Sequence, residues 1–99
     1  MAIVMHVEVK GMGATKEEVE TFTGLVLDRI KTFPGFIAHA SGPIEGGYYV
    51  TEFWESQEAH ERWAREEVEP AMLRLSGGQP FQGPLPQIQY LPAYDVITR

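Results

Sequence analysis

Cysteine is absent from the 99 residues of this chain. Disulfide bonds are therefore excluded, and so are metal sites that depend on thiolate ligands. The absence does not by itself identify a cellular compartment.

Basic residues are scarce, because 8 lysines and arginines stand against 14 aspartates and glutamates, for a net charge of -6. No cluster of Lys or Arg interrupts this acidic balance. Such a surface repels phosphate backbones and anionic lipids. We therefore expect neither nucleic acid nor membrane among the partners of this protein.

Long apolar runs and common catalytic motifs are also missing. After Met1 there is neither a basic segment nor an uninterrupted apolar one. We therefore expect no signal peptide, no transmembrane helix and a cytoplasmic location. No nucleophile elbow, phosphate loop, dinucleotide-binding glycine motif or zinc-ligand spacing is present.

The length of the chain predicts one domain, residues 1–99. From Ala2 to Lys10, apolar and polar residues alternate with the period of a strand. Thr15 and Glu18 then form a capping-box pair, and an apolar stripe at helical spacing follows until Pro34 ends it. The first third of the chain is thus predicted to be a strand and a helix.

A hairpin is predicted next, because two short extended runs, residues 36–41 and 48–54, flank a glycine-rich turn. A two-residue turn at residues 45–46 places His39 opposite Glu52. A turn shifted by one residue makes the pair diagonal but leaves both side chains on the same sheet face.

A second helix and a last strand complete the pattern. Ser56 can cap a helix in which Pro70 is a point of kinking or restarting. Residues 76–86, rich in Gly, Gln and Pro, are predicted to be a loop that covers the mouth of a cleft. Residues 87–98, interrupted by Pro92, supply a fourth strand at an edge or a partner contact.

The order βαββαβ predicts an α+β, ferredoxin-like fold with a four-stranded antiparallel sheet and both helices on one side. In the first strand, Ile3, Met5, Val7 and Val9 form one row, and His6 and Glu8 lie in the other. We expect the polar row to face the helices and the apolar row to pack on the sheet of a second copy. A homodimer of short chains also completes a core that each chain alone builds only in part.

Three polar residues are candidates for catalysis: His39, Glu52 and, if it shares their face, His6. A carboxylate beside an imidazole favours the charged ring and burial favours the neutral one, so this pair can act as a general base. The alternative is that His39 and Glu52 only satisfy each other's hydrogen bonds. A second alternative is a metal-dependent oxygenase, since two histidines and one carboxylate can hold iron.

Aromatic residues could line a flat slot for a planar ligand, or they could simply fill the core. The candidate ligand-binding residues are Trp63, Phe22, Trp54 and Tyr94, the last supplying a hydroxyl from the fourth strand.

The segment from Trp54 to Trp63, with the Gly-rich hairpin before it and Glu69-Pro70-Ala71 after it, resembles the antibiotic-biosynthesis-monooxygenase type of dimeric α/β barrel. The resemblance implies small ferredoxin-like dimers that bind or oxidise flat aromatic molecules. The family that this segment resembles includes enzymes that oxidise anthrone-like polyketides to quinones without metal or flavin.

The pattern Trp54-Glu-Ser-x-Glu-Ala-x-x-x-Trp63 is also similar to bacterial heme-degrading monooxygenases of this superfamily. That similarity implies that Trp63 marks the ligand cleft. Their iron-ligating histidine corresponds to Leu73, which cannot ligate iron, and an asparagine of their first strand corresponds to His6. Heme degradation by that mechanism is not expected. The asparagine, tryptophan and arginine set of the polyketide enzymes is incomplete, because the chain contains no asparagine.

We therefore expect a homodimer, joined through the sheet face, with one cleft per subunit for a small aromatic ligand. The expected activity is that of a monooxygenase without metal or cofactor, or of a related proton-transfer enzyme, on a planar polyketide or quinone-type substrate. The competing expectation is a non-catalytic ligand-binding or interaction domain.

Overall fold

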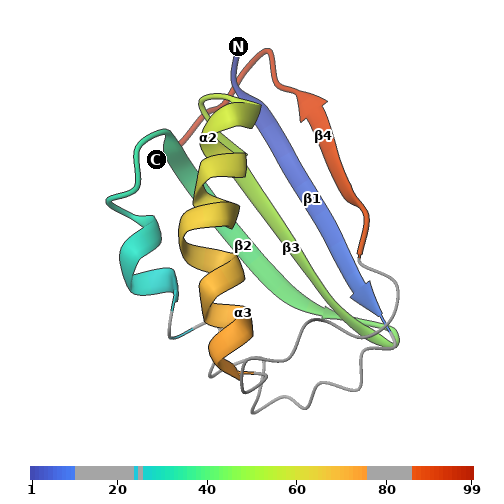
Figure 1. Ribbon diagram of the computed structural model, residues 1–99. Coiled ribbons are helices and arrows are strands. Elements are labelled where there is room, and N and C mark those ends of the chain that lie inside the picture. The colour runs from blue at the N-terminus through green and yellow to red at the C-terminus, as the bar shows by residue number, and fades with distance from the viewer. Residues whose placement is uncertain (11–23, 25, 76–85) are drawn as a thin grey trace.

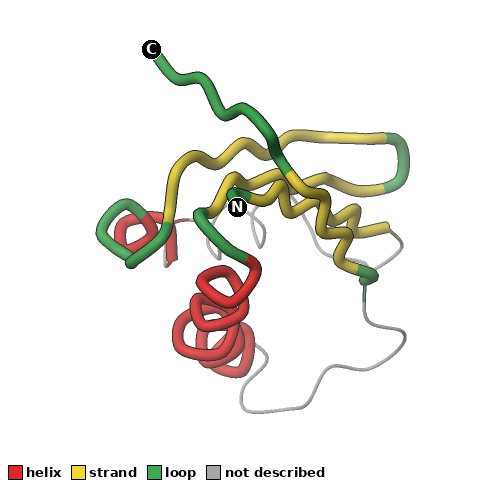
Figure 2. The backbone as a smooth tube through the Cα atoms, turned by 90° about the horizontal axis from the view of Figure 1, so that it is seen from above, coloured by secondary structure: helices red, strands yellow, loops and turns green. Residues whose placement is uncertain are grey.

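A computed structural model describes residues 1–10, 24, 26–75 and 86–99 of the chain (Figure 1). Four strands form one antiparallel sheet in the order β2-β3-β1-β4. The described helices lie on one side of this sheet (Figure 2). This arrangement confirms the predicted α+β, ferredoxin-like fold. The strands are β1, Ile3–Lys10; β2, Phe36–Ile44; β3, Gly47–Trp54; and β4, Ile88–Pro92.

The hairpin between β2 and β3 has the predicted register. Ile44 pairs with Gly47, and the turn between them contains Gly46 at a φ of 81°, a conformation that glycine adopts without steric cost. His39 consequently lies directly opposite Glu52. A register shift between Phe36 and Ala38 marks a β-bulge at the start of β2.

The second helix is built from three consecutive segments: α2, Gln57–Trp63; a π-helical turn η1, Ala64–Val68; and α3, Glu69–Leu75. Ser56 caps α2 as predicted, because its Oγ accepts the Ala59 amide at 3.1 Å. The restart near Pro70 was also predicted, whereas the π-helical turn was not. Of the first helix the structure describes Gly24 and residues 26–30, so the capping box at Thr15 and Glu18 lies outside the described residues.

The prediction for the two faces of β1 is wrong. Met5 and Val9 are 3% and 8% exposed, and Met5 belongs to the core that the helices cover. His6 and Glu8 point to the opposite side of the sheet, because side chains alternate along a strand. The helices of the same chain offer an apolar surface to the sheet. Packing the apolar row against it removes more hydrocarbon surface from water than packing the polar row there would.

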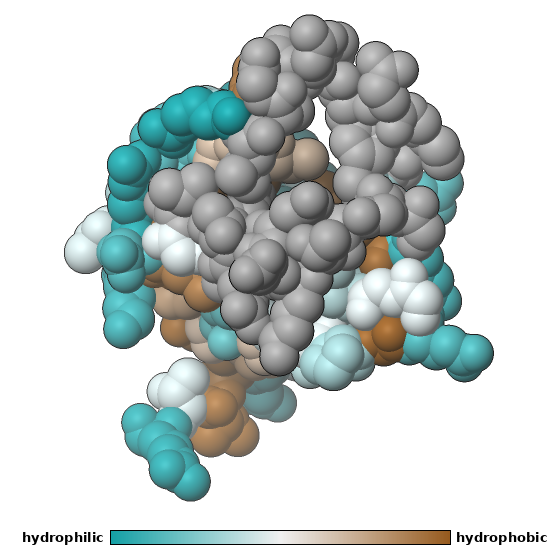
Figure 3. All heavy atoms as spheres, turned by 90° about the horizontal axis from the view of Figure 1, so that it is seen from below, coloured by the Kyte–Doolittle hydropathy of each residue, from teal (hydrophilic) through white to brown (hydrophobic). Residues whose placement is uncertain are grey.

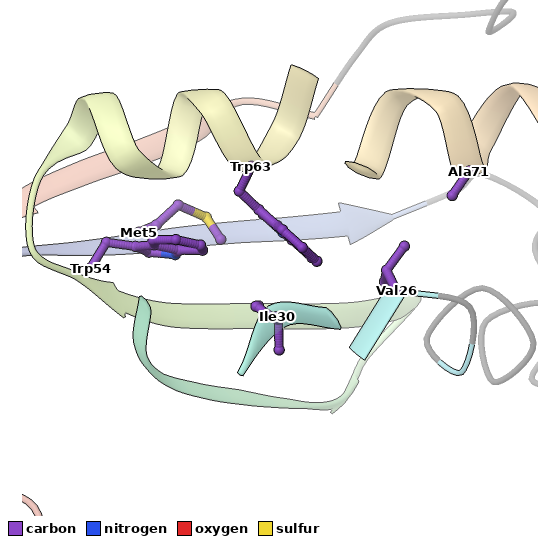
Figure 4. Packing of buried hydrophobic residues seen from close by; sticks show 6 residues of the cluster. All are labelled: Met5, Val26, Ile30, Trp54, Trp63 and Ala71. Atoms are coloured by element: carbon purple, nitrogen blue, oxygen red, sulfur yellow. The ribbon is translucent and has the colours of Figure 1, made fainter. Parts of the chain in front are cut away.

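The core lies between the sheet and the helices. Its two largest fully buried side chains are Trp54, at the end of β3, and Trp63, which reaches toward the sheet from α2 (Figure 4). Phe33 contacts both indoles edge to face, at ring-centroid distances of 6.1 and 5.2 Å. The buried cluster consists of Met5, Val26, Ile30, Trp54, Trp63 and Ala71.

The fourth strand lies at an edge of the sheet, as predicted, but it is shorter than expected. It ends at Pro92, after which the Ala93 amide donates to the Ala2 carbonyl at 2.9 Å. The last residues then leave the sheet on the side away from α2 (Figure 2), with Tyr94 87% and Ile97 90% exposed.

Apolar side chains reach the surface in several places. Viewed from below, hydrophobic residues emerge between hydrophilic ones (Figure 3). In the part of the chain that the structure describes, no helix is both long and apolar enough to cross a membrane. The exposed large hydrophobic residues are Met1, Met72, Leu73, Ile88, Leu91, Tyr94 and Ile97.

Candidate functional site

His39 and Glu52 form a hydrogen-bonded pair on the helix-facing side of the sheet. The Nδ1 atom of His39 lies 2.7 Å from Oε2 of Glu52. The Glu52 side chain is 6% exposed and that of His39 is 17% exposed. The hairpin register that places these residues opposite each other therefore also brings their side chains together.

Trp54 donates to the same carboxylate. Its indole Nε1 lies 3.0 Å from Oε1 of Glu52, two residues earlier on β3 and on the same face. Trp54 is fully buried. Trp54 thus packs in the core and supplies one of the hydrogen bonds that a buried carboxylate requires.

His60 is a buried neighbour of Glu52 that the sequence analysis did not select. It lies on α2 and is 4% exposed, with Nε2 at 3.8 Å from Oε1 of Glu52. Its Nδ1 lies 2.8 Å from the hydroxyl of Tyr90 on β4. The sequence does contain a pattern that indicates its burial: His60 precedes Trp63 by three residues and therefore lies on the same inward face of the helix.

Burial determines the protonation of this second pair. Burial lowers the pKa of His60 below its ordinary value, against the opposing effect of Glu52 and Glu61. Burial also raises the pKa of the Tyr90 phenol, with smaller contributions from Glu61 and Glu52. At neutral pH, His60 is therefore an uncharged imidazole and Tyr90 keeps its proton.

The Nε2 atom of His39 is buried and has no hydrogen-bond partner among the described residues. An ionised Glu52 accepts hydrogen bonds only, so the His39 nitrogen that faces it must be the protonated one. In the neutral ring the lone pair is then on Nε2. A lone pair held in this way can accept a proton from a group that comes within hydrogen-bond distance of Nε2.

His6 lies on the other face of the sheet and does not join this site. Its Nδ1 is 2.7 Å from Oγ1 of Thr51, and its Nε2 is 3.2 Å from Oε2 of Glu8. The reason is register, since His6 pairs with Thr51 and its neighbour Met5 pairs with Glu52. The proposed convergence of His6 with His39 and Glu52 is therefore wrong.

The metal alternative loses its ligand set for the same reason. Two histidines and a carboxylate were to meet at one point, but His6 is separated from the other two by the sheet. Within residues 1–10, 24, 26–75 and 86–99, no group of three or more His, Cys, Asp or Glu side chains is arranged to hold a metal ion.

The four candidate ligand-binding residues lie in different surroundings. Trp54 and Trp63 are 0% and 2% exposed within the core, and Tyr94 is exposed beyond the end of β4. Phe22 lies outside the described residues, as do residues 76–85 of the predicted covering loop. Leu73, at the position of the heme ligand in the resemblance, is on α3 and 48% exposed.

No protein-family model matches this chain. No curated protein sequence matches it either.

Solved structures, in contrast, share its fold. A protein of Caulobacter crescentus assigned to the antibiotic biosynthesis monooxygenases is 21% identical, with a TM-score of 0.72 over 95% of this chain and 91% of that one. A heme-degrading protein of Mycobacterium tuberculosis is 18% identical, with a TM-score of 0.64 over 99% and 100% of the two chains.

A third similar structure is SnoaB of Streptomyces nogalater, a cofactor-independent oxygenase. It is 16% identical, with a TM-score of 0.61 over 96% of this chain and 93% of that one. At such identities the likeness establishes a shared fold, which is that of the antibiotic-biosynthesis-monooxygenase structures, as the sequence resemblance predicted.

Proposed function

We propose that this protein is a cofactor-independent, monooxygenase-like enzyme that acts on a planar aromatic substrate of polyketide or quinone type. The observation that carries the proposal is the His39–Glu52 pair, in which Glu52 fixes one ring nitrogen and leaves the other without a described partner. The fold shared with SnoaB, a cofactor-independent oxygenase, supports the reaction class.

In the proposed reaction, Nε2 of His39 removes a proton from a phenol or from a CH2 group flanked by aromatic rings. The resulting anion passes one electron to dioxygen, which gives a substrate radical and superoxide. These combine through a new carbon–oxygen bond to a peroxide, which takes back the proton. Loss of water leaves a carbonyl, so that CH2 and O2 become C=O and H2O.

Glu52 is a positioning residue in this scheme. It accepts the Nδ1–H of His39 and stabilises the imidazolium that forms when Nε2 takes the proton. The Trp54 hydrogen bond at 3.0 Å holds the carboxylate in place. The surrounding apolar core limits the access of water, which strengthens both interactions.

Oxygen uptake with a panel of anthrones and hydroquinones tests the proposal, once with chelator and once with added ferrous iron. We expect uptake that persists in chelator and that falls by about 100-fold in His39→Ala. The matched control is Glu45→Gln in the exposed hairpin turn, which should retain wild-type activity. Uptake that requires iron, or that is equal in His39→Ala, would contradict the proposal.

A non-catalytic interaction domain is the second candidate, and the burial of Trp54 and Trp63 favours it. Aromatic residues that fill the core leave less room for a substrate than aromatic residues that line a cleft. This function predicts no oxygen uptake with any member of the panel and no saturable quenching of tryptophan fluorescence by a planar quinone, because a filled core leaves no space for the quinone beside the indoles.

We further propose that two copies of the chain pair through the outer face of the sheet. On that face, Val4 pairs with Phe53 on one side and with Leu91 on the other, which makes an apolar row across three strands. Leu91 is 53% exposed, and Tyr94 and Ile97 follow it. A second copy would bury this row, which water otherwise contacts.

A further inference from the structure

Four polar side chains from four elements form a series of contacts that is buried at Glu52 and His60 and partly buried at its two ends. It runs from Tyr90 on β4 through His60 on α2 and Glu52 on β3 to His39 on β2. The consecutive contacts are 2.8, 3.8 and 2.7 Å long. His39 and Glu52 belong to the proposed site, whereas His60 and Tyr90 have as yet no role in it.

The directions of the hydrogen bonds follow from which atoms of Tyr90 and His60 carry protons. Tyr90 keeps its proton at neutral pH and can donate it to Nδ1 of His60. The single proton of a neutral His60 then resides on Nε2, which faces Glu52. The distance of 3.8 Å exceeds that of a hydrogen bond, so the contact is an attraction between a carboxylate and an N–H dipole.

The opposite arrangement is unfavourable. If His60 carried its proton on Nδ1, the lone pair of Nε2 would face the Glu52 oxygen. Two lone pairs in a buried site repel each other, unless the carboxyl group is itself protonated. A protonated Glu52 could donate to His39, which would move the His39 proton to Nε2 and remove the lone pair of the base.

We propose that His60 and Tyr90 are positioning residues for the His39–Glu52 pair. Tyr90 orients the His60 ring, His60 turns an N–H toward Glu52, and Glu52 thereby remains an acceptor for Nδ1–H of His39. This inference rests on the proposed function, because it assigns the two residues to the maintenance of the general base. The charged and titratable groups around His60 are Glu52 from β3, Tyr90 from β4 and Glu61 from its own helix.

The test is the tautomer of His39, measured by long-range 1H–15N NMR at pH 8 on the full chain without substrate. In the wild type we expect a protonated Nδ1 and a lone pair on Nε2. In His60→Leu we expect the ratio of this tautomer to the other to fall at least about twofold. Rescue by His60→Gln, whose amide can again turn an N–H toward Glu52, is expected to restore the ratio.

Tyr90→Phe is the second variant, because it removes one hydroxyl and leaves the ring that packs against His60. It should lower the same ratio, and by less than His60→Leu, since the carboxylate still attracts the Nε2–H tautomer of His60. An unchanged His39 tautomer in folded Tyr90→Phe and His60→Leu would overturn the inference. So would a His60→Gln variant that behaves like His60→Leu.

Activity separates this inference from the function on which it rests. In an active enzyme, His60→Leu should lower kcat by about tenfold, with KM little changed, because the base and not the substrate contact is affected. A tautomer change in a protein without oxygen uptake would support the positioning role and reject the oxygenase. Activity together with an unchanged tautomer would reject the positioning role alone.

Discussion

Glu52 is a carboxylate enclosed by nitrogen donors. The side chains of His39 and Trp54 bond to its two oxygens, and His60 approaches one of them. A buried carboxylate is tolerated only where such partners replace its lost hydration. The residue is therefore both a constituent of the proposed site and a point at which the folded state depends on complete pairing.

Glu52→Gln is expected to destabilise the fold by about 1–3 kcal/mol. One carboxylate oxygen is replaced by an NH2 group, which cannot accept a hydrogen bond from the donors around it. Either the indole N–H of Trp54 then lacks an acceptor, or His39 moves its proton to Nε2, which has no partner among the described residues. Urea unfolding at pH 7 measures the difference, with Glu45→Gln as an exposed carboxylate-to-amide control. Equal midpoints for the two variants would contradict this account of Glu52.

His60 makes stability depend on pH. Its pKa is lowered by burial from an ordinary value of 6.5, so the unfolded chain binds more protons than the folded one below that pH. Stability contributed by the neutral ring is complete above pH 6.5 and decreases as the pH falls toward the folded-state pKa. The slope from this one group is at most about 1.4 kcal/mol per pH unit.

Urea unfolding between pH 5 and 7 measures this slope, which should be smaller in His60→Gln than in the wild type. His6→Gln removes a histidine from the opposite face of the sheet and serves as the control. It should retain the loss of stability at low pH, because His60 is still present. Parallel curves for the wild type and His60→Gln would contradict the prediction.

Gly35 joins the first helix to the sheet and touches the second helix. Its φ of 91° is in the region that favours glycine, and a Cβ added there would lie 2.6 Å from Cβ of Ala59. Its carbonyl also accepts the amide of Glu55 at 2.8 Å. Three elements are thus fixed at one glycine, which directly follows the Pro34 that was predicted to end the first helix.

Gly35 and Gly46 both have a positive φ, but an added Cβ would meet a neighbouring atom only at Gly35. Comparing alanine variants of the two therefore distinguishes the cost of backbone strain from the cost of a steric clash. Gly46 has a φ of 81°, and an added Cβ meets nothing within 4 Å. Gly46→Ala should therefore cost only the conformational penalty, about 1 kcal/mol, whereas Gly35→Ala should cost more, because α2 must also move. Thermal or urea unfolding of both variants provides the comparison. A Gly35→Ala variant that is no less stable than Gly46→Ala would argue against this contact.

At the level of elements, the sequence was most informative where a local signal is decisive. The turn at residues 45–46 set the register of His39 and Glu52, and Ser56 set the start of α2. The facing of β1 was not predictable in this way. Both of its rows satisfy the strand period, and only the packing of the helices decides which row is buried.

For the molecule as a whole, the fold followed from the order of the elements, whereas the site followed only in part. His39 and Glu52 meet because one hairpin contains both. His60 and Tyr90 come from a helix and a strand 30 residues apart in sequence, so their contact depends on tertiary packing. His6 was misplaced because one residue along a strand reverses the face of the sheet.

The proposed dimer makes a prediction about molecular mass. Chains of 11.1 kDa should sediment as dimers, and Leu91→Glu should shift them toward monomers, because a buried carboxylate would interrupt the apolar row. Ile88→Glu is the matched control, since Ile88 is also exposed on β4 but lies on the other face. Dissociation by both variants, or by neither, would argue against pairing through the outer face.

The π-helical turn η1 makes the second helix tolerant of substitutions there but intolerant of deletions. In a regular α-helix, residues eight apart, such as Trp63 and Ala71, point about 80° away from each other. The wider turn at Ala64–Val68 reduces this angle, and both residues are buried in the core. The exposed residues of this turn can therefore vary freely in kind, but their number is fixed. A chain shortened here by one residue would rotate α3 and carry Ala71 out of the core while every side chain of the site kept its identity.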